Sequence, residues 1–453
     1  MLHPINRQAM GVLCLCFDFD GEMQGIWSGR DHADGSGIPE AQTSIALLLD
    51  EQGQVLASSD LHWIGVGANV HPHHDGASAL HVHGGRTYLV QSAVSAGYQG
   101  YMGPRGWRAQ IMTPLELAFG LQSQAGLDGL DAAVAQGLLA HAHRFCPPLH
   151  AIHSAADTIR RVVWNGRVMT AGKQMDNTRL QAVLEQIGET GARTNEVFSQ
   201  SIDALYGTVL NTALRDNSLL TSLLVDLLDR NLYERANDCR WWALTPEFRH
   251  ILAQPAVDKA SLARLEDILE YINSYYTVYS NLFLYDAHGV VLACSQAAER
   301  GLYGQQINED YVRRTLSLKD SDDFAVSPFR TTPLYHPRGK AQPTYVYSAP
   351  VFAPEGGQAV GGIGIVFDSL PQFADMLGDT LPKNSEGKVV EGAAGYFAEA
   401  GGTLVAASDA QMIPGEVCPL QPQWLALGQG EYHSQLESVD GVLYAVGCAR
   451  SRG

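Results

Sequence analysis

The sequence predicts an α+β protein in which antiparallel-sheet modules are repeated and joined by long helices. A chain of 453 residues is too long for one hydrophobic core, since domains usually contain about 100–200 residues. A short hairpin-like pattern occurs three times, and a long segment with few turn residues separates its first two copies. Apolar residues make up 45% of the chain, which is enough for each module to bury a core of its own.

The repeated pattern contains an acidic residue, two spacers, glycine, one spacer, two aliphatic residues, alanine, one spacer and serine. An apolar run precedes each copy, and the acid with the glycine is typical of a β-hairpin turn. Short hairpins of this composition are common in unrelated sheets, but three copies indicate three related modules. The copies are Asp50-x-x-Gly53-x-Val55-Leu56-Ala57-x-Ser59, Asp286-x-x-Gly289-x-Val291-Leu292-Ala293-x-Ser295 and Glu399-x-x-Gly402-x-Leu404-Val405-Ala406-x-Ser408.

Each hairpin is followed by a second predicted strand, and in the first two copies also by a glycine-rich turn, a further strand and an amphipathic stretch. The second strands are residues 87–94, 344–352 and 443–449. The third copy stops at Gly453 before any closing strand. We therefore expect its sheet to be incomplete and the chain to be the front part of a longer protein. The predicted division is a first module at 11–120, a helical linker at 121–235, a second module at 236–380 and a partial third module at 381–453.

Helix formers dominate the middle of the chain, where apolar residues are spaced by three and four. Residues 174–235 predict one long helix or two nearly continuous ones, and Cys146-Pro147-Pro148 predicts a break before them. Such a length favours a helical hairpin, a coiled coil or a signalling stalk, and we expect a homodimer contact here. The alternative is that Leu219, Leu223 and Leu227 pack against the sheets of the same chain. Adjacent Trp241 and Trp242 must point in different directions on a helix.

Charge and cysteine usage exclude several classes of function. The formal charge of −18, from 48 acidic and 30 basic residues, argues against nucleic acid or anionic lipid as a partner. No run approaches the ~20 apolar residues of a spanning helix, and residues 1–10 lack the layout of a secretory signal. The seven cysteines are scattered and form no CxxC pair. We expect a cytoplasmic protein without membrane insertion.

Motifs of catalysis and metal binding are missing. The sequence contains no GxSxG, HExxH or GxxxxGK[ST] pattern, so we expect no enzyme and no cofactor. The glycines at 356–364 flank and enter a strand, as hairpin and bulge residues do. Imidazoles can bind zinc, copper or nickel, but only Asp75 adds a further ligand type nearby, so a solvated polar loop is the favoured interpretation and a metal-responsive protein the alternative. The clustered histidines are His62, His71, His73, His74, His81 and His83.

The second module contains a succession of features that carries a resemblance. A long entering helix is followed by a strand at 276–285, the turn at 286–289, Ser327-Pro328-Phe329-Arg330, a strand at 345–352 and Gly361-Gly362-Ile363-Gly364-Ile365-Val366-Phe367-Asp368. This order resembles the Cache-type, PAS-like sensory domains of bacterial chemoreceptors and sensor kinases. Residues 92–107 look like the corresponding segment of another such unit.

The resemblance implies a small-molecule pocket between a curved sheet and the loop over it. The acid after the last strand, Asp368, would face a ligand amine through a charge-assisted hydrogen bond. Arg330 would bind a carboxylate at the other end. Alternatively, Asp368 caps the following helix. In the first module Thr113 matches Asp368, so that module would be silent or bind something else. Aromatic walls, with cation–π attraction, would come from Trp242, Phe329, Tyr345 and Tyr347.

The expected function is that of a small-molecule-sensing region in a bacterial, chemotaxis-type signalling protein. The second module would bind a metabolite, such as an amine or an amino-acid-like compound, and the long helices would transmit the change to a downstream signalling protein or output domain. The alternative is a ligand-free scaffold that assembles a signalling complex through its helices.

Overall fold

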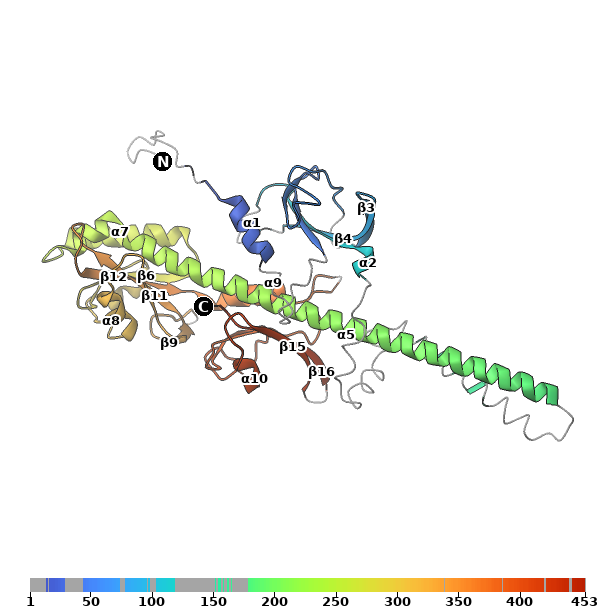
Figure 1. Ribbon diagram of the computed structural model, residues 1–453. Coiled ribbons are helices and arrows are strands. Elements are labelled where there is room, and N and C mark those ends of the chain that lie inside the picture. The colour runs from blue at the N-terminus through green and yellow to red at the C-terminus, as the bar shows by residue number, and fades with distance from the viewer. Residues whose placement is uncertain are drawn as a thin grey trace. The chain divides into compact units, whose positions relative to one another are not determined.

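The computed structural model describes residues 14, 16–28, 44–73, 78–95, 97, 103–118 and 178–452, except 338, 385, 419–420 and 440–441, together with some residues between 151 and 164. Two compact units are formed, Met1–Arg215 and Asp216–Gly453. Helix α5 (Thr178–Ala243) runs from the first unit into the second as one continuous helix (Figure 1). The predicted break at residues 146–148 lies outside the described residues, and the four-part division of the chain stays a prediction.

The first unit contains α1 (Phe19–Ser28), a five-stranded antiparallel sheet and α2 (Leu115–Ala118). The order of the sheet is β2-β1-β5-β4-β3. One face carries a core of nine buried residues, including Leu47, Tyr88 and Met112. The strands are β1 (Ile45–Leu49), β2 (Val55–Ser58), β3 (Ala79–His83), β4 (Arg86–Val94) and β5 (Arg108–Pro114).

The main sheet of the second unit has the same topology. Its order is β7-β6-β12-β11-β8. If the five strands of each sheet are numbered along the chain, both sheets have the spatial order 2-1-5-4-3, and all neighbouring strands are antiparallel. The prediction of repeated antiparallel-sheet modules joined by a long helix is confirmed. The strands are β6 (Tyr279–Asp286), β7 (Val291–Cys294), β8 (Ala325–Val326), β11 (Val346–Phe352) and β12 (Ala359–Phe367).

All three copies of the repeated pattern form a hairpin with one hydrogen-bonding scheme. The final serine donates its N–H to the carbonyl thirteen residues earlier, and its hydroxyl accepts the N–H of that same residue. A buried backbone pair is thereby satisfied at the end of the hairpin, which explains why the pattern ends in serine. The two distances are 2.9 and 2.9 Å for Ser59 with Ala46, 2.8 and 2.8 Å for Ser295 with Leu282, and 2.9 and 3.0 Å for Ser408 with Gly395.

Each copy of the repeat also contains a second glycine, which was not recognised from the sequence pattern. Gly67, Gly304 and Gly415 have φ values of 85°, 74° and 93°, a region that favours glycine. The residue three positions later donates its N–H to the carbonyl of the turn glycine. This bond ties a third segment to each hairpin. The distances are 2.9 Å for Val70 to Gly53, 2.9 Å for Ile307 to Gly289 and 2.8 Å for Cys418 to Gly402.

Side chains of the main second-unit sheet alternate between two buried layers, as the period of two in a strand requires. We call them the α5-side core and the α8-side core. The α5-side core joins the sheet to α5, α6 (Pro246–Leu252) and α7 (Lys259–Tyr275). The α8-side core joins it to α8 (Asp310–Ser317) and comprises Phe283, Tyr285, Val291, Cys294, Tyr311, Val312, Ala325, Leu334, Tyr335, Val346 and Val366.

The long helix follows the sequence prediction for residues 174–235 but extends to Ala243. Trp241 is 75% exposed and Trp242 5%, so the two tryptophans do point in opposite directions. Thr245 occupies the cap position of α6 with Pro246 in the first turn, although the threonine side chain makes no capping hydrogen bond. The helix break therefore rests on proline geometry.

The third copy has no closing strand among the described residues, which agrees with the sequence prediction, and its strands form two separate two-stranded sheets. The hairpin β13 (Tyr396–Ala398) and β14 (Leu404–Ala407) is followed by a second hairpin, β15 (Tyr432–Val439) and β16 (Val442–Ala449). The predicted strand at 443–449 is thus the last strand of this hairpin. Residues 432–439 were missed because polar and charged side chains interrupt their apolar positions. The second hairpin is attached to α5, since Ser218 Oγ donates to Ser434 Oγ (2.9 Å) and Ser451 Oγ to Asp229 Oδ1 (2.7 Å).

Candidate functional site

Polar groups gather inside the α8-side core of the second unit. The Tyr285 hydroxyl lies 2.6 Å from Ser348 Oγ, which donates to the carbonyl of Ile363 at 3.0 Å. Tyr285 and Ser348 are both fully buried. Burial raises the pKa of Tyr285, so the phenol stays protonated. Because unpaired polar groups are costly in an apolar layer, this small network holds the Tyr285 side chain in one position.

The glycines of β12 make room for these rings. A Cβ on Gly364 would lie 2.1 Å from the Phe283 ring, and one on Gly362 would lie 2.3 Å from the Tyr285 hydroxyl. The far ends of these two β6 rings therefore lie against the backbone of the neighbouring strand. The sequence suggested hairpin and bulge roles for these glycines. The pairing of β11 with β12 does shift register near the start of β12, opposite Val351 and Phe352, but the inner glycines serve close packing.

Tyr311 on α8 contributes a buried hydroxyl to the same layer. The residue is 2% exposed, and its hydroxyl has no hydrogen-bond partner among the described residues. Burial, and after it the charge of Glu309, raise the pKa of Tyr311 well above its usual value, while Arg330 opposes the shift. The phenol is thus a neutral group that can donate one hydrogen bond and accept another.

Asp368 joins this side of the sheet through Tyr335. The Tyr335 hydroxyl donates to Asp368 Oδ1 at 2.5 Å, and Tyr335 belongs to the α8-side core. Asp368 also stands at the cap position of α9 (Ser369–Thr380), but its side chain makes no capping bond. The carboxylate is half-buried, and its backbone N–H donates to Val278 O at 2.9 Å.

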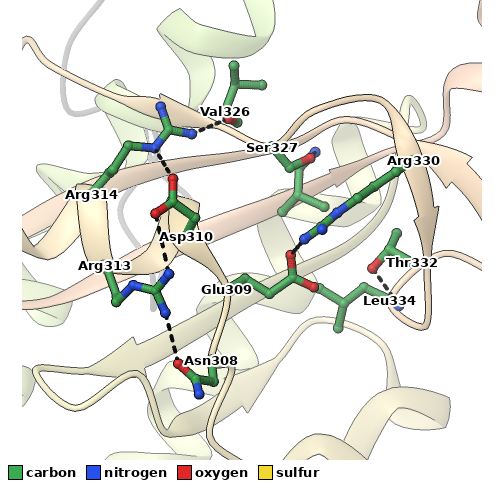
Figure 2. Close-up of polar contacts among 11 residues, drawn as sticks. Asn308, Glu309, Asp310, Arg313, Arg314, Val326, Ser327, Arg330, Thr332 and Leu334 are labelled. Carbon is green, nitrogen blue, oxygen red and sulfur yellow. Dashed lines mark hydrogen bonds and ion pairs between the residues drawn. The ribbon is translucent and has the colours of Figure 1, made fainter. Parts of the chain in front are cut away.

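An ion pair links the beginning of α8 to β9 (Arg330–Thr332). Arg330 contacts Glu309 directly, and their side chains are 52% and 24% exposed. Figure 2 shows this pair beside the network of Asp310, which binds Arg314 Nε at 3.0 Å. Arg314 donates in turn to the carbonyl of Val326 at 2.7 Å. The first turn of α8 is therefore attached by charge to the strands next to it, on the side where Tyr311 enters the core.

The sequence-predicted aromatic residues lie elsewhere. Trp242, Phe329 and Tyr347 belong to the α5-side core, and Tyr345 packs against it. Trp242 contacts the rings of Tyr276 and Tyr279. The structure therefore places the four aromatic residues on the α5 side of the sheet. Asp368 is instead bound to Tyr335, and Arg330 is paired with Glu309. Parity along β11 is the reason, because Tyr345 and Tyr347 point away from Ser348.

Arg235 is a buried charge that the sequence analysis missed. It is 5% exposed, and its guanidinium lies 5.3 Å from the Tyr279 ring and 5.6 Å from the Phe367 ring. Its Nη2 pairs with Glu234 at 2.9 Å, whereas Nε and Nη1 have no partner among the described residues. Aromatic faces thus provide much of its surroundings. The available signal was its position on the same helix face as Cys239 and Trp242.

Glu399 departs from its two counterparts in the repeat. Asp50 and Asp286 bond the backbone of their own turns, at 2.9 and 2.8 Å and at 2.8 and 3.0 Å. Glu399 is one methylene longer, and its Oε1 accepts the Phe329 N–H and the Tyr345 hydroxyl, both at 3.3 Å. Two predicted site residues of the second module are thereby connected to the third hairpin.

Nucleophilic and metal chemistry find little support in the described residues. Burial raises the pKa of Cys239, and it raises that of Cys294 to about 12, so both thiols stay protonated. Within the described ranges no three His, Cys, Asp or Glu side chains are arranged to hold a metal ion. The register of the first sheet also corrects the match to Asp368: Gln110 pairs with Leu47 as Gly364 pairs with Phe283, so Pro114, not Thr113, is the counterpart. Thr113 bonds Ser44 at 2.7 Å.

Comparisons with known proteins find similarity to sensory domains in structure only. No protein-family model matches the chain, and no curated protein matches it in sequence. One similar solved structure is the sensor domain of the histidine kinase DctB from V. cholerae, with 16% identity, 47% of this chain and 74% of that chain covered, and a TM-score of 0.36. Another is the ligand-binding domain of the Campylobacter jejuni chemoreceptor Tlp3 in complex with 4-methylisoleucine, with 14% identity, coverage of 53% and 91%, and a TM-score of 0.37.

A third similar structure is the extracellular domain of the histidine kinase vpHK1S-Z8, with 12% identity, coverage of 53% and 90%, and a TM-score of 0.33. The neighbours are ligand-binding sensory domains of signalling proteins, so the predicted resemblance to the sensory domains of chemoreceptors and sensor kinases is confirmed. The predicted cytoplasmic location is contradicted, because these neighbours include a domain named as extracellular, and we withdraw it.

Among the described residues, no helix is both long enough and apolar enough to cross a membrane.

Proposed function

We propose that the chain is the small-molecule-sensing region of a signalling protein and that its second unit binds the ligand on the α8 side of the sheet. The observation that carries the proposal is the Tyr311 hydroxyl, which is buried and has no partner among the described residues. Leaving a hydroxyl unpaired in an apolar layer costs about 1–3 kcal/mol. A ligand that bonds this hydroxyl removes the cost, so binding is favoured at this position.

Charged groups suggest the chemistry of the ligand. Asp368 is held by Tyr335 and suits an ammonium group. Arg330 is half-exposed and paired with Glu309, and its planar guanidinium suits a carboxylate that exchanges with Glu309. A compound with both groups, such as an amino acid, satisfies both. We propose an amine or an amino-acid-like metabolite.

Transmission would use α5, which packs on the opposite side of the same sheet. A ligand that brings α8 closer to the sheet would change the α5-facing surface of that sheet, against which Arg235 and Trp242 pack. Such coupling requires that the ligand bind two states with different affinity. We propose that α5 passes the change to a downstream signalling protein or output domain and that it also forms the homodimer contact.

A thermal-shift screen of the purified chain tests the proposal. The panel contains amino acids, amines and small carboxylates, because a ligand bound only by the native state raises the unfolding temperature. We expect a hit that is lost in Asp368→Asn and kept in Asp375→Asn, since Asp375 is exposed on α9. A hit that survives in Asp368→Asn would contradict the proposed site.

The ligand-free scaffold is the second candidate, and one observation favours it. Phe283, Tyr285 and Tyr335 are fully buried, so large side chains already fill the α8-side core. In that case the chain would bind partners through its helices alone. The same screen separates the two candidates, because the scaffold predicts that no compound of the panel changes the unfolding temperature.

A further inference from the structure

Four histidines of the first unit form a cluster on its sheet. The ring centroids of His71 and His73 are 5.4 Å apart, those of His73 and His81 are 5.1 Å apart, and those of His71 and His81 are 6.1 Å apart. His83 lies 6.4 Å from His81. The sequence suggested a solvated loop here, but residues 79–83 are strand β3, and His73, His81 and His83 are half-buried.

The cluster occupies the same face of the sheet as the first-unit core. His81 is the cross-strand partner of Tyr88, which is fully buried in that core. Leu47 also belongs to this core, and its counterpart by the repeated pattern is Phe283 of the α8-side core. The histidines of the first module therefore stand on the side that corresponds to the proposed ligand side of the second module.

Hydrogen bonds fix the histidine segment to the sheet. Buried Gln110 accepts the His73 N–H and donates to the His71 carbonyl, both at 3.3 Å. Ser92 donates to Gln110 at 2.7 Å, and Arg108 donates to the His73 carbonyl at 2.8 Å. These bonds therefore fix the backbone that carries His71 and His73 beside the sheet.

We propose that this histidine cluster gives the first unit a second sensory function, in which a fall of pH below about 6.5 loosens the edge formed by β3 and β4. The cluster adds positive charge as its imidazoles are protonated, and the described residues beside it include two arginines, one of them paired with a carboxylate. Arg108 contacts the segment from β5, and Arg86, opposite His83 in the hairpin, is bound to Glu116 on α2 at 2.6 Å. Tyr88, which faces His81, accepts a hydrogen bond from Trp63.

The direction of the pH effect follows from His81. Burial, and then the neighbouring His73, His71 and His83, lower the pKa of His81. Because the folded-state pKa lies below the unfolded-state value, the neutral imidazole stabilises the folded unit above the unfolded-state pKa. That stability is lost as the pH falls through the folded-state pKa. Among the described residues, no three His, Cys, Asp or Glu side chains are arranged to hold a metal ion.

Hydrogen exchange of the full chain tests the proposal, at about pH 7.5 and about pH 5.5 and with a chelator present. Peptides from β6 and β12 serve as an internal reference for the intrinsic effect of pH on exchange. We expect protection of β3 and β4 to fall severalfold relative to this reference in acid. The triple variant His71→Gln, His73→Gln, His81→Gln should keep its protection, whereas His62→Gln, an exposed histidine of the same unit, should behave as the parent.

Two results would overturn the proposal: no relative loss in the parent at the lower pH, or an equal loss in the triple variant. If the triple variant is already unprotected at the higher pH, His81→Gln alone decides. The His81→Gln variant should lose less protection than the parent when the pH is lowered, and an equal loss would contradict the role of the cluster. None of these results depends on the ligand proposed for the second unit.

Discussion

Single residues explain why the repeated pattern has its composition. The serine at the end of each copy satisfies two backbone groups of the first strand, and the turn glycines Gly53, Gly289 and Gly402 have φ values of 84°, 76° and 83°. The turn was predicted correctly, because the acid and the glycine are local signals, whereas the role of the serine emerged only from the structure. The role of Gly364 could not be predicted, because it depends on a ring from a strand about eighty residues earlier in the chain.

Gly364 leads to a prediction about stability. In Gly364→Ala the new methyl group would overlap the Phe283 ring, and we expect the second unit to lose roughly 1–3 kcal/mol of unfolding free energy. The matched control is Gly378→Ala in α9, where a Cβ meets nothing within 4 Å and alanine should stabilise the helix by up to about 1 kcal/mol. Urea unfolding measures both, and equal midpoints for the two variants would contradict the packing described for β12.

At the scale of secondary structure, the alternation of side chains along a strand explains why the predicted binding residues lie on different sides of the sheet. Alternation along β11 sends Tyr345 and Tyr347 toward α5 and Ser348 toward α8. The sequence identifies the strand, but the side on which α8 lies is decided by tertiary packing. Tyr311 and Tyr335 were missed for the same reason, since they belong to α8 and to a loop whose approach to the sheet has no local sequence signal.

Glu399 makes a prediction at this scale. Glu399→Asp should restore the self-contained turn seen at Asp50 and Asp286 and lose the bonds to Phe329 and Tyr345. We expect exchange of the Phe329 amide to rise about fivefold, because a net hydrogen bond contributes about 1 kcal/mol. Glu416→Asp, an exposed acid of the same region, is the control. Unchanged exchange at Phe329 would show that the third hairpin does not support the second module.

For the whole molecule, the order of strands was predictable in outline because the same module occurs more than once. Strand β15, which forms a hairpin with β16 in the third copy, was not predicted, since it carries His433, Gln435 and Glu437 among its apolar residues. Docking of that hairpin depends on Asn217, Ser218 and Asp229 of α5. These contacts join residues far apart in the sequence, so no pattern within the strand predicts them.

The proposed homodimer also belongs to this scale. Leu219, Leu223 and Leu227 are 49%, 45% and 37% exposed and repeat every four residues on α5. If this stripe forms the dimer contact, the double variant Leu219→Glu, Leu223→Glu should sediment as a monomer at concentrations where the parent is a dimer. Lys259→Glu, on exposed α7 surface, controls for the change in charge. A parent that sediments as a monomer, or a double variant that stays dimeric, would contradict the contact.

The most direct test of the central claim compares two tyrosines on opposite sides of one sheet, by calorimetric titration with a ligand that the screen identifies. Tyr311→Phe removes a buried hydroxyl that has no partner among the described residues, so we predict that it stabilises the free protein by about 1–3 kcal/mol and weakens ligand binding. Tyr347→Phe, in the α5-side core, should leave the affinity unchanged. Weaker binding in Tyr347→Phe with unchanged affinity in Tyr311→Phe would place the ligand on the α5 side and contradict the account.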